Sequence, residues 1–236
     1  MSIEINNLKE ELKKYIDLEK AEFFPRFFKV GPGEYGEGDV FIGVTVPNQR
    51  KVARKFKNLS LQDIESLLNE DFHEYRLTAL LILVHQFEKS KEDNKRALVD
   101  FYIENADRVN NWDLVDSTAH KILGPYLDNK DREILYKLAK EDHLWKQRIA
   151  IMSTFYFIKN EDYKDALAIA EILLKHKHDL IHKAVGWMLR EIGKRDKEVE
   201  VEFLNKHYKQ MPRTMLRYAI EKFPNEERQN YLKGRV

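Results

Sequence analysis

Apolar residues recur at three- and four-residue spacing along most of the chain, with polar residues between them. This is the pattern of amphipathic helices that bury one face. Short polar segments separate the periodic stretches and mark the helix ends. The predicted helices cover residues 3–15, 18–28, 47–56, 61–68, 72–87, 93–105, 112–127, 131–140, 144–158, 163–174, 181–192, 199–208, 212–222 and 226–232.

Residues 31–46 interrupt this pattern. The segment Gly31–Gly36 formally matches G-x-G-x-x-G, but no strand precedes it, and Glu34 and Glu37 would repel a pyrophosphate. We therefore expect a flexible, glycine-rich loop and no dinucleotide site. The run from 40 to 46 is β-like but has no partner strands nearby. It is interpreted as an extended approach to Pro47, which is predicted at the first position of the next helix.

The helices also repeat. Residues 74–79 resemble residues 146–150, residues 181–185 hold the same place in their own helix, and similar helices recur every 30 to 40 residues. That spacing is near the period of HEAT repeats, whose helix pairs must stack to bury their apolar faces. The prediction is an all-α fold, a curved α-solenoid of HEAT-like helical repeats that forms a single domain over residues 1–236. Such an array presents a concave surface.

The amino-acid composition excludes several kinds of functional site. The chain has 236 residues and no cysteine, which excludes disulfides, a thiolate nucleophile and cysteine-ligated zinc, and fits a cytoplasmic location. The longest apolar run, residues 79–84, is too short to span a bilayer, and no apolar leader opens the chain. We expect a soluble protein without a membrane partner.

The net charge of +1 is low for a nucleic-acid-binding protein. The charge is unevenly distributed, however, at about −5 over residues 1–142 and about +6 over residues 143–236. The basic second half could therefore present a phosphate-binding face that the total conceals.

The segment from Asn111 to Ser117 has the most distinctive chemistry. Asn111 is predicted to cap a helix, and Asp113 would lie in the positive first turn. Trp112 and Asp116 are four residues apart and would share one helical face. An indole beside a carboxylate forms a site for a cationic, flat-sided group. The alternative is a core tryptophan with an aspartate that points to water.

Arg148 and Trp187 are two further candidates for a functional role. Arg148 falls among apolar positions and needs a carboxylate, a helix-end carbonyl or a phosphate as partner; the alternative is an arginine that bridges adjacent repeats. Trp187 follows Gly186 inside a helix, where glycine is tolerated for close approach of another helix or a ligand. On a solenoid, Trp112, Asp116, Arg148 and Trp187 could converge on the concave surface.

Other clusters are interpreted structurally. The stripe of Phe23, Phe24, Phe27 and Phe28 is predicted to be core. The three histidines between residues 176 and 182 are interleaved with lysines that would repel a cation, so no metal site is expected. The chain has no motif for a hydrolase nucleophile, a P-loop or a calcium loop, and no cofactor is expected.

Three segments in matching order, residues 112–117, 144–150 and 181–191, resemble the AlkD-type family of alkylpurine DNA glycosylases, built from HEAT-like repeats. Lys20-Ala21-Glu22 and the Pro47-x-x-Arg50 helix entry also fit, and the resemblance extends over about residues 10–220. It implies a monomer without metal or cofactor. Its partner would be duplex DNA containing alkylated purines such as 3-methyladenine and 7-methylguanine, which are excised without base flipping.

The resemblance also assigns roles. Asp116 would be the catalytic carboxylate, and Trp112 and Trp187 would pack against the deoxyribose of the damaged nucleotide. Arg148 would hold the neighbouring phosphate. The DNA-binding residues that it implies are Arg148, Lys183 and Arg190. Because an alkylated purine is already cationic, it can leave without a general acid, and a carboxylate then stabilises the oxocarbenium-like sugar and positions water.

Two alternatives to a base-excision enzyme remain open. The chain could be a non-catalytic family member that binds distorted or branched DNA, or a HEAT-repeat scaffold that binds proteins. The near-neutral charge favours the second of these alternatives.

Overall fold

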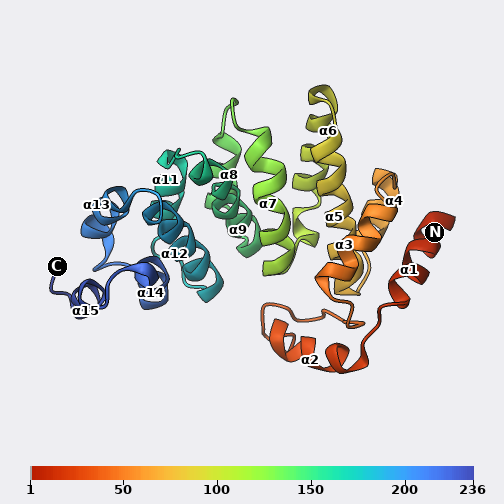
Figure 1. The fold of residues 1–236 in the computed structure, drawn as a ribbon, viewed down its shortest axis with the longest axis horizontal. Coiled ribbons are helices and arrows are strands. Elements are labelled where there is room, and N and C mark those ends of the chain that lie inside the picture. The colour runs from red at the N-terminus through yellow and green to blue at the C-terminus, as the bar shows by residue number, and fades with distance from the viewer. Residues whose placement is uncertain (1) are drawn as a thin grey trace. The chain divides into compact units, whose positions relative to one another are not determined.

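A computed structural model describes residues 2–236 of the chain (Figure 1). Over these residues the fold consists of helices and connecting loops, with a single isolated β-bridge between Val40 and Phe72 and no strand. The predicted all-α fold is confirmed.

The chain divides into two compact units, and the division falls between Thr118 and Ala119, inside helix α7 (Trp112–Tyr126). The first unit contains α1 (Ile3–Lys13), α2 (Leu18–Phe28), α3 (Val46–Lys55), α4 (Leu61–Leu68), α5 (His73–Lys89), α6 (Glu92–Glu104) and the 3-10 helix η1 (Ala106–Arg108). The second contains α8 (Glu133–Lys140), α9 (Leu144–Ser153), α10 (Phe155–Lys159), α11 (Lys164–Ile172), α12 (Asp179–Gly193), α13 (Lys197–His207), α14 (Arg213–Ala219), η2 (Ile220–Lys222) and α15 (Asn225–Lys233). A single domain and a curved solenoid stay predictions.

In the first unit, α3 and α4 pack on α5, which is buried along most of its length. Sequence signals set the helix starts. The Ser60 side chain caps α4 by accepting from the Asp63 amide at 3.1 Å, as the sequence predicts. Helix α3 begins one residue earlier than predicted, at Val46, so Pro47 occupies its second position.

The loop after α2 is irregular, as predicted, and its second part is anchored to α5. The flexibility of the Gly31–Gly36 segment stays a prediction. The Glu74 carboxylate accepts hydrogen bonds from the backbone amides of Ile42, Gly43 and Val44, the shortest at 2.8 Å to Gly43. Gly43 has φ of 80°, and a Cβ there would lie 2.0 Å from the Asp17 carbonyl oxygen. The Glu74 carboxylate, which is about 30 residues away in the sequence, therefore holds this loop against the start of α5. The composition of the loop itself does not reveal this contact.

In the second unit, α12 packs between α9 and α14. Gly186 allows α14 to approach, because an added Cβ would lie 2.4 Å from the Met215 carbonyl oxygen. The helix predicted over residues 144–158 is wrong in one respect, since it breaks into α9 and α10 at Thr154. The Thr154 amide and hydroxyl both donate to the Ile151 carbonyl oxygen, which tightens the turn there.

One buried carboxyl in this unit has an oxygen without a hydrogen-bond partner among the described residues. Glu200 of α13 is 1% exposed, and its Oε1 has no hydrogen-bond partner in the described part of the chain. Burial raises the pKa of Glu200 from 4.5 to about 8, although Lys197 and Arg190 partly oppose the shift. The carboxyl is therefore protonated at neutral pH in the folded protein.

The raised pKa predicts how stability depends on pH. The unfolded chain releases the Glu200 proton near pH 4.5 and the folded chain near pH 8, so stability falls as pH rises between these values. Glu200→Gln removes this dependence and should raise the melting temperature relative to wild type at pH 8.5 but not at pH 4.5. Thermal melts at both pH values test this. Glu202→Gln, on an exposed residue of the same helix, is the control. An equal change at both pH values would contradict the assignment.

Candidate functional site

The first turn of α7 is where the strongest sequence signal falls, and the structure begins the helix there. The Asn111 carbonyl oxygen accepts from the Val115 amide at 3.2 Å, and its side-chain oxygen accepts from the Trp112 amide at 2.8 Å. The Asp113 carboxylate accepts from the Leu114 amide at 3.0 Å. The polar side chains of the motif thus satisfy amides that the helix leaves unpaired.

A buried histidine links this turn to two other parts of the first unit. His73, the first residue of α5, places Nδ1 3.0 Å from Asp39 Oδ2 and Nε2 2.9 Å from Asp113 Oδ2. All three residues are under 10% exposed. A single imidazole therefore joins the glycine-rich loop, α5 and α7.

Two more side chains complete the arrangement around Asp39. The Arg76 guanidinium donates to Asp39 Oδ1, and Asn111 Nδ2 donates to Asp39 Oδ2 at 2.9 Å. We call Asp39, His73, Arg76, Asn111 and Asp113 the His73 network. Asp39 is thus contacted by three side chains from two other segments of the unit.

The charges within the His73 network compensate one another. Burial lowers the pKa of His73, but Asp113 and Asp39 outweigh burial and raise it to about 9. Burial raises the pKa of Asp39, but hydrogen bonding to His73 and the charge of Arg76 lower it below its usual value. The cation His73 therefore bridges two carboxylates, which is the pairing that buried charges require.

Aromatic packing connects the His73 network to Trp112. The rings of Phe28 and Phe41 each lie 4.9 Å from the His73 imidazole, measured between centroids. Phe28 also stacks on the Trp112 indole at 5.4 Å with an interplanar angle of 21°. The orientation of the Trp112 ring therefore depends on Phe28, and the position of Phe28 depends on the network.

Trp112 and Asp116 both lie at the partly exposed surface of α7, four residues apart on one face. Asp116 is close enough to Tyr102 to contribute to its raised pKa, after the larger effect of burial. The Tyr102 hydroxyl lies 2.8 Å from the hydroxyl of Thr118, a buried residue two positions after Asp116. A partly exposed indole and a partly exposed carboxylate therefore lie one turn apart on the same helical face, as the sequence analysis expects.

In the second unit, Trp187 of α12 is also partly exposed. Its indole Nε1–H donates to Glu191 Oε1 at 3.3 Å, and the Phe155 ring lies 5.9 Å away. These contacts from both sides fix the plane of the indole.

Arg148 is 4% exposed and donates to the Leu180 carbonyl oxygen at 2.5 Å. It thereby bridges α9 and the start of α12, which is the structural alternative raised from the sequence. The expected phosphate contact of Arg148 stays a prediction. Lys183 pairs with Asp179 at 2.7 Å, and Arg190 pairs with Glu221. Both pairs include an exposed carboxylate that a phosphate could replace.

The predicted site residues are distributed over both units. Trp112 and Asp116 belong to the first, whereas Arg148, Lys183, Trp187 and Arg190 belong to the second. Their convergence on one surface stays a prediction.

The phenylalanine stripe of α2 is predicted to be core, and this is wrong for two of its members. Phe28 is buried, but Phe23 is 56% exposed and Phe27 is 49% exposed. Figure 1 shows α2 at the edge of the first unit, followed by the long connection to α3. The unit covers only one face of this helix, and the apolar pattern continues onto the other.

Sequence analysis also missed the His73 network. Its members come from three segments separated by 34 and 40 residues, and no local spacing connects them. The available signal was the placement of His73 and Arg76, one turn apart, in a helix that is otherwise apolar. Polar groups at such positions need buried partners.

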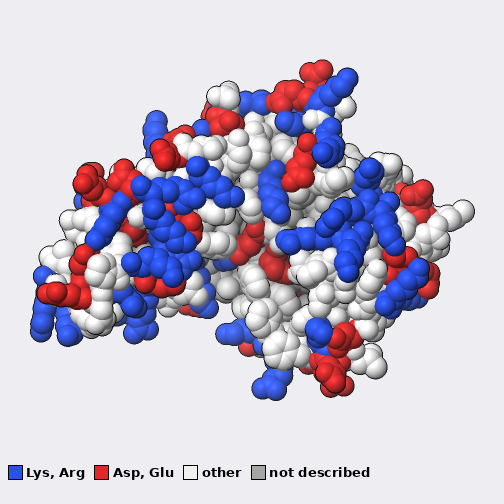
Figure 2. All heavy atoms as spheres, in the orientation of Figure 1, with Lys and Arg blue, Asp and Glu red and all other residues white. Residues whose placement is uncertain are grey.

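Basic side chains gather on one helix of the first unit, although the net charge of that unit is negative. Helix α3 and the residue two places beyond it carry exposed Arg50, Lys51, Arg54, Lys55 and Lys57. Figure 2 shows lysine and arginine gathered over this region. The whole-unit sum thus conceals a locally basic surface.

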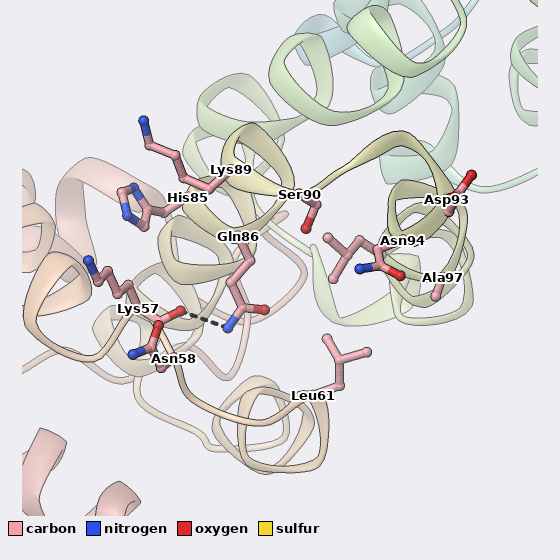
Figure 3. A pocket seen from close by; sticks show the side chains of 11 residues that line it. Lys57, Asn58, Leu61, His85, Gln86, Lys89, Ser90, Asp93, Asn94 and Ala97 are labelled. Carbon is pink, nitrogen blue, oxygen red and sulfur yellow. Dashed lines mark hydrogen bonds between the residues drawn. The ribbon is translucent and has the colours of Figure 1, made fainter.

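A groove of about 730 Å³ lies between the end of α5 and the start of α6, and Figure 3 shows its lining. The Gln86 amide there donates to the Lys57 carbonyl oxygen at 2.9 Å. The groove contains none of the predicted site residues. Among residues 2–236, no cluster of three or more acidic, histidine or cysteine side chains suits a metal ion. Over the same residues, every helix is too short or too polar to cross a membrane.

The His73 network predicts a large effect of removing its cation. His73→Phe leaves Asp39 and Asp113 as buried carboxylates without the imidazole between them, and should cost about 3 kcal/mol or more of unfolding free energy. Protonated His73 stabilises the fold fully below pH 6.5, and this contribution is lost as pH rises to about 9. The unfolding free energy lost in His73→Phe should therefore be larger at pH 6 than at pH 9.5.

Urea unfolding at both pH values measures this loss. His85→Phe, in the same helix but outside the network, serves as the matched control. A loss below about 1 kcal/mol for His73→Phe at pH 6, similar to that of a surface change, would show that the network does not hold the first unit together.

The comparisons with known proteins agree with this architecture. A family model described as "DNA alkylation repair enzyme" matches residues 8–223. No curated protein matches the chain. A solved structure described as a "Predicted DNA alkylation repair enzyme from Enterococcus faecalis" has a TM-score of 0.69 to this chain at 16% identity, and covers 89% of this chain and 97% of its own. The match over nearly the whole sequence shows that the chain belongs to the DNA alkylation repair enzyme family.

Proposed function

We propose that the protein is a DNA glycosylase that hydrolyses the N-glycosidic bond of cationic alkylpurines, such as 3-methyladenine and 7-methylguanine, in duplex DNA without base flipping. Membership of the DNA alkylation repair enzyme family supplies the general activity. The observation that carries the specific proposal is the partly exposed pair of Trp112 and Asp116 on the firmly held first turns of α7.

The chemistry requires little beyond a carboxylate. Alkylation at N3 or N7 makes the purine cationic, so when the C1′–N bond breaks, the electron pair neutralises the departing base. The sugar becomes an oxocarbenium-like cation, which Asp116 stabilises electrostatically. Water then adds to C1′, and Asp116 accepts its proton. This assigns Asp116 two roles at the same carbon.

The two tryptophans are proposed to support the cationic sugar. Indole faces attract positive charge and exclude water without reacting. Trp112 is oriented by its stack on Phe28, and Trp187 by Phe155 and Glu191. Both rings are thus held before DNA binds, which avoids an entropic cost on binding. Our proposal includes the convergence of the two rings on one nucleotide.

Phosphate binding is proposed for Lys183 and Arg190, whose side chains lie on the same helix as Trp187. Each would exchange its present carboxylate partner for a phosphate. Arg148 is proposed to support them mainly through its bond to the Leu180 carbonyl, which holds the start of α12 against α9. A phosphate contact by Arg148 remains part of the hypothesis.

The proposal predicts that Asp116→Asn lowers release of 7-methylguanine and 3-methyladenine from methylated duplex DNA by at least about 100-fold, because the amide lacks the charge that stabilises the sugar cation. Chromatography of the released bases under single-turnover conditions measures the rates. Ser117→Ala, at the partly exposed neighbouring position, should release both bases at the wild-type rate.

Two results would contradict the proposal. Full base release by Asp116→Asn would exclude the carboxylate mechanism. The absence of release by wild-type protein that is folded and retained on DNA would identify a non-catalytic DNA-binding member of the family.

A further inference from the structure

An aromatic surface extends from Trp112, at the start of α7, onto the residues of α2 that have no assigned role in base release. Phe23 and Phe27 are about half exposed and stack on each other at 6.0 Å with an interplanar angle of 28°. The Phe27 ring contacts the Trp112 indole edge-on at 5.8 Å. We call Phe23, Phe27 and Trp112 the aromatic strip.

The strip is not the exposed margin of an incompletely buried core. Phe24 and Phe28 of the same helix already supply its inward contacts, and both pack against Phe41 at 5.8 and 5.0 Å. Phe23 and Phe27 touch Phe24 and Phe28 edge-on, at 6.5 and 5.0 Å, yet about half of each side chain stays exposed. Exposed aromatic side chains grouped in this way mark interaction surfaces.

Charge indicates what kind of partner the strip would receive. Arg26 and Lys29 are exposed beside Phe27, and no ion pair engages them among the described residues. The acidic residues of α2, Glu19 and Glu22, lie toward its other end. The end of the strip next to Trp112 thus combines bare aromatic faces with free cations, a combination that suits a nucleotide, which has both a π-face and a phosphate.

We propose that the aromatic strip binds an unpaired nucleobase of DNA by stacking. A fully paired B-form duplex keeps its base faces covered, so only a bulged, extrahelical or terminal base can offer one. Phenylalanine has no hydrogen-bonding group, so the strip reads the presence of an unpaired base and not its identity. This inference rests on the DNA binding of the proposed function and adds a preference for locally unpaired DNA.

Fluorescence anisotropy with two labelled duplexes tests the inference, one fully paired and one with a single-nucleotide bulge, at the same salt concentration. Wild type should bind the bulged duplex roughly tenfold more tightly, which is within the range expected for stacking one base. Phe23→Ala and Phe23→Leu should both lose this preference, because leucine keeps apolar surface but has no π-face. Leu18→Ala, at a 74% exposed apolar residue of the same helix, should keep it.

The outcomes separate this inference from the proposed function. Equal affinity of wild type for the two duplexes would overturn the inference and leave the proposed function intact. A preference that survives in both Phe23 variants would assign the bulge contact to other residues and also overturn it. A preference lost in Phe23→Ala but kept in Phe23→Leu would overturn the inference as well, because the contact would then be apolar and not stacking. A wild-type protein that binds neither duplex would contradict both proposals.

Discussion

Asp39 and Asp113 share one buried imidazole, and the arrangement of the first unit around α7 depends on that sharing. A buried carboxylate needs a charged or hydrogen-bonding partner, and His73 is the group that contacts both. The same imidazole stacks against Phe28 and Phe41. Charge compensation and ring packing thus act on the same side chain. Together they hold the start of α7 in place within the first unit.

This constraint has a chemical consequence for the proposed mechanism. Electrostatic stabilisation of a sugar cation works only if the carboxylate and the aromatic faces are in place before charge develops. The Asn111 cap sets the helix start, and Phe28 sets the plane of Trp112. Asp116 follows one turn later on the same face. The fold therefore holds these groups in place through buried contacts within the first unit.

Local signals in the sequence were sufficient for most of the helices, for the cap at Asn111 and for the shared face of Trp112 and Asp116, because each depends on residues within about one turn. They did not reveal the break at Thr154. They could not reveal the His73 network, whose members are brought together only by tertiary packing. Periodicity identified α2 as apolar but could not show which of its faces the unit covers. Gly186 was flagged correctly as a point of close approach, and the structure identifies α14 as the neighbour.

The central claim is that His73 is a cation that bridges Asp39 and Asp113. Long-range ¹H–¹⁵N NMR spectra of the histidine rings at pH 7.5 test it most directly, with His73→Phe used to assign the signal. The account predicts that both ring nitrogens of His73 carry a proton at this pH and that neither titrates until the pH approaches about 9. A neutral imidazole with one bare nitrogen at pH 7.5 would contradict it, because the ring would then carry no charge and could donate to only one of the two carboxylates.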